Sequence, residues 1–397
     1  MDKATQFCLK TGLIIMKLAV CLYKLFPFGG LARDCVRILS LCYAKGAEID
    51  VFVMQCEGEI PEGFNVEVIK PKGLTNHSKV ANYVAEIKPR LAKGNYDLVI
   101  GFNKMPGLDL YYAADPCYID RVKKQCNYPV MQFSGRVKYY RQNEKAVFGP
   151  DSQTVGLMIS DIERDKFKQH YNTPDNRLVM LPPGIDPNRK RSDDWQTRRQ
   201  QFRTQFQLSD EDIVILMVGS GFKRKGVDRV IVGLASLSSI LREKTKLFVL
   251  GEDTIPAFES QARQLGVADN VTFFGGRSDV PEFLVGTDLF LHPARKENTG
   301  TVILEAIVAG LPAFVSGACG YAGHIIKSDT GLVSAEPFEQ QAFNHQLASM
   351  LDKGKLQQWS KKALHYAESE DLYSMPQKVA AIIETMVEEK RKAGDNH

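Results

Sequence analysis

The sequence has 397 residues and a formal net charge of +4; 44% of its residues are hydrophobic and 25% are charged. A chain of this length exceeds what one compact core usually organises, so we expect two α/β domains. Because the charge is nearly balanced, a uniformly basic nucleic-acid-binding protein is excluded, and any basic surface must be local.

The eight cysteines form no Cys-x-x-Cys pair and no cluster with the spacing of a zinc site. Several lie in apolar segments, which indicates reduced core residues of a cytoplasmic protein. No apolar run approaches the ~18 residues of a membrane span. Residues 12–16 have a weak signal-peptide character, but Lys17 interrupts the run and no cleavage site follows. We therefore expect residues 1–15 to be a dispensable extension.

The first domain is predicted to begin with a strand, a glycine loop and a helix. Residues 17–22 form a short apolar run, and the loop at 26–30 ends in Gly29 and Gly30. Apolar residues recur on one face of residues 31–45, as in an amphipathic helix. This order is typical of the start of a Rossmann-like domain, in which the two glycines would let the backbone approach a ligand closely.

Further strands are predicted at residues 49–53, 66–69 and 97–100. The last of them leads into a polar loop that contains Asn103 and Lys104, and Asp115 comes shortly afterwards. Polar loops at the carboxyl ends of parallel strands are where open α/β sheets bind ligands. Alternatively, Asp115 caps a turn before a proline.

Residues 118–148, here called the basic segment, combine cations with aromatic side chains. The segment contains two anions, Asp120 and Glu144, and seven cations: Arg121, Lys123, Lys124, Arg136, Lys138, Arg141 and Lys145. Basic residues interleaved with aromatic rings are typical of contact with an anionic membrane surface. A solvated helix whose rings pack inward is the other interpretation. RNA would suit the same composition, but no nucleic-acid motif accompanies it.

A strand at 155–159, a helix at 161–170 and a strand at 178–185 that ends in a Pro-Gly turn come next. We place the domain boundary near residue 170. The first domain is then expected to span residues 16–170 and the second residues 171–374.

The second domain restarts the pattern with a buried strand at 213–218 and a glycine turn at 219–226 that carries Lys223, Arg224 and Lys225. The turn is neither a P-loop nor Gly-x-Gly-x-x-Gly. A cationic glycine turn after a strand suits a pyrophosphate, although a solvated basic turn has the same composition. The acidic triplet 210–212 looks like a metal-binding Asp-x-Asp motif, but it precedes the strand, so we expect a solvated turn there.

Two glutamates, Glu297 and Glu305, are separated by a polar loop that leads into an apolar helix. A buried strand at 288–294 precedes them, and a Gly-Leu-Pro sequence ends the helix. The N–H groups of residues 299–302 are expected to attract a diphosphate as the unpaired donors of a helix start. Glu305, expected about two turns into the helix, suits the hydroxyls of a ribose, and Glu297 suits those of a sugar. A solvated helix start is the alternative.

Two glutamates at this spacing, followed by Ala-x-x-Ala-Gly-Leu-Pro at residues 306–312, resemble the large family of retaining glycosyltransferases with the GT-B fold. The sequence Lys-Leu-Phe-Pro-Phe-Gly-Gly at residues 24–30 and the block at 101–118 narrow this resemblance to lipopolysaccharide core glucosyltransferases of the WaaG type. The resemblance covers residues 17–390.

The resemblance implies two Rossmann-like domains that face each other across a cleft, with residues 375–397 returning to the first domain. It implies a retaining enzyme that transfers glucose from UDP-glucose to a heptose of the lipopolysaccharide inner core. The acceptor would be lipid-linked, and the protein would lie on the cytoplasmic face of the inner membrane, attached to anionic lipid through the basic segment. Neither a cofactor nor a metal is expected, because fixed cations would stabilise the leaving diphosphate.

The residues and the resemblance together define an expected site. The expected catalytic residues are Glu297, Lys225, Arg224 and Asp115. The expected donor-binding residues are Gly29, Gly30, Arg189, Arg224, Lys225, Arg277, Glu297, Thr299, Gly300, Thr301, Val302 and Glu305. The expected acceptor-side residues are Asp34, Asn103, Lys104 and Asp115.

Two other functions stay open. A UDP-sugar 2-epimerase on the same fold needs neither an acceptor nor a membrane-facing segment. A non-catalytic membrane-surface protein would not need both glutamates and the cationic turn together. The residues also leave open whether the transferred sugar is glucose, galactose or N-acetylglucosamine.

Overall fold

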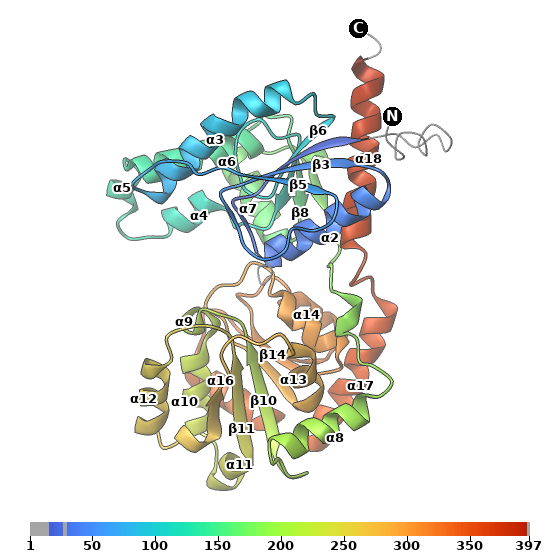
Figure 1. Cartoon of the computed structure of the whole chain (residues 1–397). Coiled ribbons are helices and arrows are strands. Elements are labelled where there is room, and N and C mark those ends of the chain that lie inside the picture. The colour runs from blue at the N-terminus through green and yellow to red at the C-terminus, as the bar shows by residue number, and fades with distance from the viewer. Residues whose placement is uncertain (1–15, 27–29, 395–397) are drawn as a thin grey trace. The chain divides into compact units, whose positions relative to one another are not determined.

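The computed structural model describes residues 16–26 and 30–394. The expected extension at residues 1–15 and the predicted ligand glycine Gly29 lie outside these ranges. The chain divides into two compact units (Figure 1). Unit 1 runs to Gly184 and resumes at Ser374, and unit 2 is Ile185–Tyr373.

Unit 1 is built on a seven-stranded parallel sheet in the order β5-β3-β1-β6-β7-β8-β9. Its strands are β1 (Lys17–Cys21), β3 (Glu48–Val53), β5 (Phe64–Val68), β6 (Leu98–Gly101), β7 (Leu110–Ala113), β8 (Val155–Met158) and β9 (Leu178–Met180), and β2 (Lys24–Leu25) pairs with β4 (Gln55–Cys56) beside it. The chain winds outward in both directions from β1 and β6, so these neighbours form the switch point where open α/β sheets bind ligands.

Helices cover both faces of this sheet. The helices are α2 (Gly30–Ala44), α3 (Asn76–Lys93), α4 (Tyr118–Lys123), α5 (Tyr128–Met131), α6 (Gly135–Phe148) and α7 (Asp161–Tyr171), with a short 3-10 turn, η1 (Asp175–Arg177). On one face Cys35 and Ile38 of α2 pack in an apolar core, and on the other Tyr83 of α3 and Phe167 of α7 do so. The cysteines that the structure describes are all unpaired, and several of them belong to these cores.

The chain leaves unit 1 later than the expected boundary near residue 170. Strand β9 pairs with β8 and therefore completes the first sheet, so the division falls after Gly184. The last helix, α18 (Met375–Gly394), returns to unit 1 and lies along α2 (Figure 1). Val379, Ile383 and Val387 of α18 are buried in the same core as α2.

Unit 2 repeats the design with six parallel strands in the order β12-β11-β10-β13-β14-β15. The strands are β10 (Ile213–Val218), β11 (Thr245–Leu250), β12 (Val271–Phe273), β13 (Leu289–His292), β14 (Ala313–Ser316) and β15 (Gly331–Ser334). The four central strands β11, β10, β13 and β14 are almost fully buried, as expected for a parallel sheet covered on both faces. The switch point lies between β10 and β13.

The helices of unit 2 also lie on both faces of its sheet. They are α8 (Trp195–Gln205), α9 (Phe222–Lys225), α10 (Val227–Ala235), α11 (Ser239–Glu243), α12 (Pro256–Gln264), α13 (Val280–Gly286), α14 (Thr301–Val308), α15 (Ala322–Ser328), α16 (Gln340–Met350) and α17 (Lys353–Ser369), with 3-10 turns η2 (Pro187–Arg189) and η3 (Ala268–Asn270). One apolar core joins α8, α13, α14 and α17, and another joins α10, α12 and α16. Two Rossmann-like units thus make up the described chain.

The basic segment forms the short helices α4, α5 and α6 in unit 1 (Figure 1). Its apolar residues divide into two groups. Val137, Val147 and Phe148 are buried, whereas Val130 and Phe133 are 78% and 69% exposed. Within residues 16–26 and 30–394, no helix is both long enough and apolar enough to cross a bilayer.

Candidate functional site

In unit 2 the cationic turn (residues 219–226) and the acidic loop (residues 293–300, which contains Glu297) lie at the switch point of the sheet. The turn follows β10 and the loop follows β13, two strands that pair directly. Gly226 closes the turn with φ of +84°, and a Cβ there would lie 2.2 Å from the carbonyl oxygen of Pro293. Only glycine therefore permits the turn to pack this closely against the acidic loop.

Glu297 is held by side chains from both segments. Its Oε2 lies 3.0 Å from Arg224 Nη1 and 3.3 Å from His292 Nε2, and it also forms an ion pair with Lys225 Nζ. Lys225 Nζ is 3.5 Å from His292 Nε2. The structure thus brings together Glu297, Arg224 and Lys225, three of the four expected catalytic residues.

The electrostatics of this cluster keep the carboxylate ionised. Burial favours the neutral acid, but hydrogen bonding by His292 and the charge of Lys225 outweigh it and hold the pKa of Glu297 well below its usual range. Burial also lowers the pKa of His292 to about 4, against the opposing effect of Glu297. His292 is therefore neutral near pH 7 and donates from Nε2 to the carboxylate. Burial likewise lowers the pKa of Lys225, while the Glu297 carboxylate favours its charged form.

The third cation of the turn has a different partner. Lys223 Nζ lies 2.7 Å from Asp228 Oδ2, and Arg295 contacts both oxygens of the same carboxylate at 2.7 Å. Asp228 thus pairs with Lys223 and Arg295, and neither of these cations contacts Glu297. Two cations face the single carboxylate of Glu297, which leaves that cluster with one surplus positive charge.

The helix that follows the acidic loop begins later in the chain than predicted. Gly300 adopts φ of +82° as the N-cap of α14, and no side chain caps this end. Among the described residues, the amide groups of Thr301 and Val302 have no acceptor, and the same holds for Thr299 and Gly300. Four free donors therefore lie within a few residues of Glu297, as an anion site at a helix start requires.

Glu305 is the fifth residue of α14, so it lies just over one turn into the helix rather than the predicted two. It is buried, and its Oε1 lies 3.7 Å from Arg189 Nε. That nitrogen is itself buried and has no hydrogen-bond partner among the described residues. Arg189, which was expected to bind the sugar donor, therefore lies beside Glu305. The structure records no contact between Arg189 and Glu297.

Two further predictions concern the edges of this site. Arg277 pairs with Asp279, at 2.7 Å from Nε to Oδ1, and lies over the ring of Phe283, so its guanidinium does not contact the Glu297 cluster. The acidic triplet 210–212 lies in a turn before β10, as predicted. Among residues 16–26 and 30–394, no group of three His, Cys, Asp or Glu side chains is arranged to hold a metal ion.

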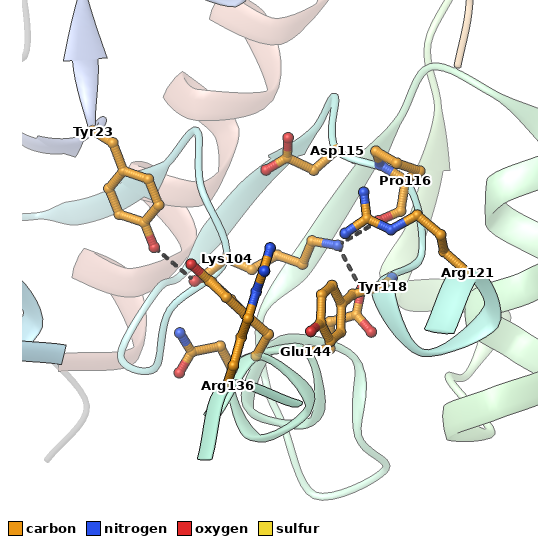
Figure 2. A pocket seen from close by; sticks show the side chains of 10 residues that line it. Tyr23, Lys104, Asp115, Pro116, Tyr118, Arg121, Arg136 and Glu144 are labelled. Carbon is orange, nitrogen blue, oxygen red and sulfur yellow. Dashed lines mark hydrogen bonds and ion pairs between the residues drawn. The ribbon is translucent and has the colours of Figure 1, made fainter. Parts of the chain in front are cut away.

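In unit 1 three expected acceptor-side residues meet at the switch point between β1 and β6. They line or adjoin a cavity of about 220 Å³ (Figure 2). Asn103 accepts a hydrogen bond from the backbone N–H of Tyr23 at 2.8 Å and donates to Asp115 Oδ2 at 3.4 Å. The Tyr23 hydroxyl donates to the carbonyl of Lys104 at 3.3 Å.

Lys104 is neutralised inside this cavity by Glu144. Lys104 Nζ lies 2.6 Å from Glu144 Oε1 and 2.8 Å from the carbonyl of Pro116 (Figure 2). Glu144 is 1% exposed, and it also accepts from the amides of Tyr118 and Ile119 and from the Tyr171 hydroxyl. These four donors make Glu144 a structural anion that ties α6 to the start of α4.

The other expected residues of unit 1 lie on α2. Gly30 is its first residue and is exposed. Asp34 accepts a hydrogen bond from the Tyr112 hydroxyl at 2.9 Å, which joins α2 to β7. Neither residue lines the cavity that contains Lys104 and Asp115.

Several side chains that the structure places at these two sites were not assigned to them from the sequence. His292 was assigned only to a buried strand, and its position at the carboxyl end of that strand is the signal that could have identified it. Glu144, Arg121 and Arg136 were grouped with the basic segment, although the structure places them on the cavity of unit 1. Their signal is weaker, because it depends on how α4 and α6 fold back on the sheet.

Comparison with known proteins gives consistent results. Residues 198–365 match the family described as Glycosyl transferases group 1. The chain is 43% identical to the lipopolysaccharide glucosyltransferase WaaG of Escherichia coli, over 93% of this chain and 98% of that protein.

Solved structures agree with the fold. The crystal structure of WaaG, a glycosyltransferase involved in lipopolysaccharide biosynthesis, superposes with a TM-score of 0.87 over 92% of this chain and 99% of that chain. The structure of Anabaena HepE in complex with UDP and glucose superposes with a TM-score of 0.73 over 93% of this chain and all of that chain. HepE is 18% identical, so this second likeness bears on the fold alone.

Proposed function

Because the chain belongs to the glycosyltransferase family that includes the lipopolysaccharide glucosyltransferase WaaG, we propose that it transfers glucose from UDP-glucose to a heptose of the lipopolysaccharide inner core. The reaction retains the anomeric configuration, and no covalent enzyme intermediate forms. The fold is the two-unit GT-B fold of these relatives.

The observation that carries this proposal is the cluster around Glu297. Its surplus positive charge and the free amides at the start of α14 form one anion-binding surface at the switch point of unit 2. A nucleotide diphosphate is opposite to this surface in charge and offers several acceptor oxygens to its donors. As the bond to the sugar breaks, negative charge grows on that diphosphate, and fixed donors stabilise it without reorganisation.

Each expected donor residue has a role in this proposal. Arg224 and Lys225 bind the diphosphate, and Glu305 accepts hydrogen bonds from the ribose hydroxyls. The ionised carboxylate of Glu297 accepts a hydrogen bond from a hydroxyl of the sugar. It also stabilises the positive charge that develops at the anomeric carbon of that sugar. These cations and the free amides of α14 stabilise the leaving group in place of a metal ion in this proposal.

The acceptor side of the proposal lies in unit 1. Asp115 and Asn103 present a carboxylate and an amide at the cavity beside Lys104. Such groups bind sugar hydroxyls, and Asp115 is the candidate partner of the accepting hydroxyl. The Lys104–Glu144 pair fixes the loop that carries these groups.

The proposal also includes a site of action at the cytoplasmic face of the inner membrane, because the acceptor is carried by lipid. Six of the seven cations of the basic segment have no carboxylate partner among the described residues, since only Lys124 pairs, with Asp120. Val130 and Phe133 are exposed in the same segment. Cations beside exposed apolar side chains suit an anionic lipid surface.

A panel of nucleotide sugars tests the proposed function. The protein is incubated with UDP-glucose, UDP-galactose or UDP-N-acetylglucosamine, with and without a heptose-terminated core acceptor, and the UDP released is measured. We expect release to be fastest with UDP-glucose and to depend on the acceptor. Conversion of the UDP-sugar into an epimer without acceptor, or no conversion of any donor, would contradict the proposal.

A further inference from the structure

The cavity of unit 1 contains two arginines to which the proposed reaction gives no role. Arg121 comes from α4 and Arg136 from α6, and both line the cavity on either side of Tyr118 (Figure 2). Both are exposed, and neither forms an ion pair with a described residue. The third cation of the cavity, Lys104, is instead neutralised by buried Glu144.

An aromatic ring supports one of the two guanidinium groups. The rings of Tyr118 and Tyr140 are 5.1 Å apart, and the guanidinium of Arg121 lies 5.2 Å from the centre of the Tyr118 ring. Burial raises the pKa of both tyrosines, and the charges of Arg136 and Arg121 oppose this increase. A planar guanidinium stacked on a ring keeps its N–H groups directed outward for a planar or tetrahedral oxyanion.

A buried amide lies behind the arginine pair. Asn143 lines the same cavity and is 4% exposed, and its Nδ2 has no hydrogen-bond partner among the described residues. Because this nitrogen is closed off from solvent, an atom bound in the open cavity does not reach it. The hydroxyl of Tyr139 is also buried without a partner among the described residues, and Asn143 lowers the pKa of this hydroxyl against the effect of burial, so the two groups lie beside each other. The case for a ligand therefore rests on the two arginines and on the charge of the cavity.

The charges of the cavity divide it into two ends. Three cations, Lys104, Arg121 and Arg136, face two carboxylates, Asp115 and Glu144, so the lining carries one surplus positive charge. Glu144 is saturated by four donors. Asp115 with Asn103 therefore marks an end suited to hydroxyls, and the arginine pair marks an end suited to an anion.

We propose that Arg121 and Arg136 form a subsite for an oxyanion, a carboxylate or a phosphate, which the acceptor carries next to its accepting sugar. The subsite makes the enzyme select a charged acceptor over a neutral one with the same hydroxyls. This inference rests on the proposed function, since it assigns the acceptor of the same reaction. Hydrogen bonds between charged partners are worth about 10- to 100-fold in affinity.

The test compares three acceptors: a methyl heptoside, its phosphate monoester, and a disaccharide of the heptose and a uronic acid. For each acceptor, kcat/KM and calorimetric affinity are measured with the parent, Arg121→Gln, Arg136→Gln and Arg141→Gln. Arg141 is an exposed cation of the same helix α6 that does not line the cavity, so its variant is the matched control. Thermal unfolding checks that each variant is folded.

We expect the ratio of kcat/KM for a charged over the neutral heptoside to fall by about 10- to 100-fold in Arg121→Gln and Arg136→Gln. Arg141→Gln should keep the ratio of the parent. The charged acceptor whose ratio falls in these variants, the phosphate monoester or the uronic acid disaccharide, identifies the oxyanion. An unchanged ratio in both variants, or a parent that binds charged and neutral heptosides equally, would overturn the inference.

Two further outcomes separate this inference from its alternatives. If the parent binds a charged heptoside through the two arginines but transfers no glucose, the subsite stands and the proposed function fails. A lipid headgroup offers the same phosphate chemistry, so binding to vesicles of anionic phospholipid without acceptor is measured in parallel. Loss of vesicle binding in both variants with an unchanged acceptor ratio would assign the arginines to lipid and refute the subsite.

Discussion

His292 and Glu297 form a contact that joins the end of a strand to the loop after it. His292 Nε2 lies 3.3 Å from Glu297 Oε2, and the imidazole is fully buried at the end of β13. Its Nδ1 has no partner among the described residues, so the proton resides on Nε2 and is donated to the carboxylate. His292 is therefore a positioning residue that fixes Glu297 from the side of the protein core.

The burial of His292 predicts a pH-dependent stability. Burial lowers the pKa of His292 from 6.5 to about 4, so the unfolded chain binds a proton in this interval and the folded chain does not. The contribution of neutral His292 to the free energy of unfolding is fully present above pH 6.5. It is lost as the pH falls towards 4, and this loss amounts to up to about 3 kcal/mol. Urea unfolding at several pH values should show this slope in the parent and its reduction in His292→Gln.

The matched control for this experiment is His365→Gln, because His365 is exposed in the same unit. It should leave the slope as it is in the parent. Glu297, whose pKa is also lowered, adds a loss of stability in the same direction below its ordinary value of 4.5, so the comparison is made above that pH. An identical slope in the parent and in His292→Gln would refute the assignment.

The cationic turn predicts different effects for two neighbouring lysines. Lys225→Ala should lower kcat by about 100-fold, because removal of one fixed donor to a developing anion costs ~3 kcal/mol. Lys223→Ala should have little effect, since Lys223 pairs with Asp228. The steady-state rates of both variants and of the parent are measured with saturating UDP-glucose, and circular dichroism checks that each variant is folded. Near-normal turnover in Lys225→Ala would remove this residue from the mechanism.

Activity is expected to survive chelation. In the proposed mechanism, Arg224, Lys225 and the free amides of α14 stabilise the leaving diphosphate in place of a divalent metal. Transfer rates are measured after dialysis against EDTA, and again after magnesium or manganese is added. Activity that disappears with EDTA and returns with either metal would show that these groups are insufficient.

The structure shows which cations of the basic segment are suitable for a test of membrane binding. Arg136 lines the cavity of unit 1 and Lys124 pairs with Asp120, so neither reports on lipid contact alone. Replacing Lys123 and Lys138 by Gln, together with Val130→Ser and Phe133→Ser, should weaken binding to anionic vesicles. The loss should be largest at low salt for the lysines, at roughly 1 kcal/mol each.

The control for vesicle binding is Ile240→Ser with Ile326→Ser, which removes exposed apolar side chains of unit 2. These substitutions should leave vesicle binding as it is in the parent. Donor hydrolysis should continue in all of these variants. If the basic-segment variant sediments with anionic vesicles as well as the parent does, the segment is not the lipid contact.

Much of the fold follows from local sequence. Strands such as β1 and β10 are continuous apolar runs bounded by glycine loops, so their positions were predicted to within one or two residues. Strands β7, β14 and β15 were not predicted, although each forms a four-residue strand of its sheet. The domain boundary was misplaced because the pairing of β9 with β8 depends on the assembled sheet.

The site could be predicted where its charged side chains directly follow the carboxyl ends of strands. Glu297 and the cationic turn were expected together because both follow strands of one parallel sheet. The Arg189–Glu305 pair was not foreseen as a pair, since it joins η2 to α14 across a long sequence separation. Glu144 was misjudged as part of a membrane-facing surface, because its burial depends on how α6 packs beside Lys104.

The most direct test of the central claim is the structure of the product. The protein is given UDP-glucose and a heptose-terminated core acceptor, and the oligosaccharide formed is analysed by NMR. The account predicts one new glucose, attached to the heptose in the α configuration of the donor, with one UDP released for each bond formed. A β linkage, or release of UDP without a new glycosidic bond, would contradict it.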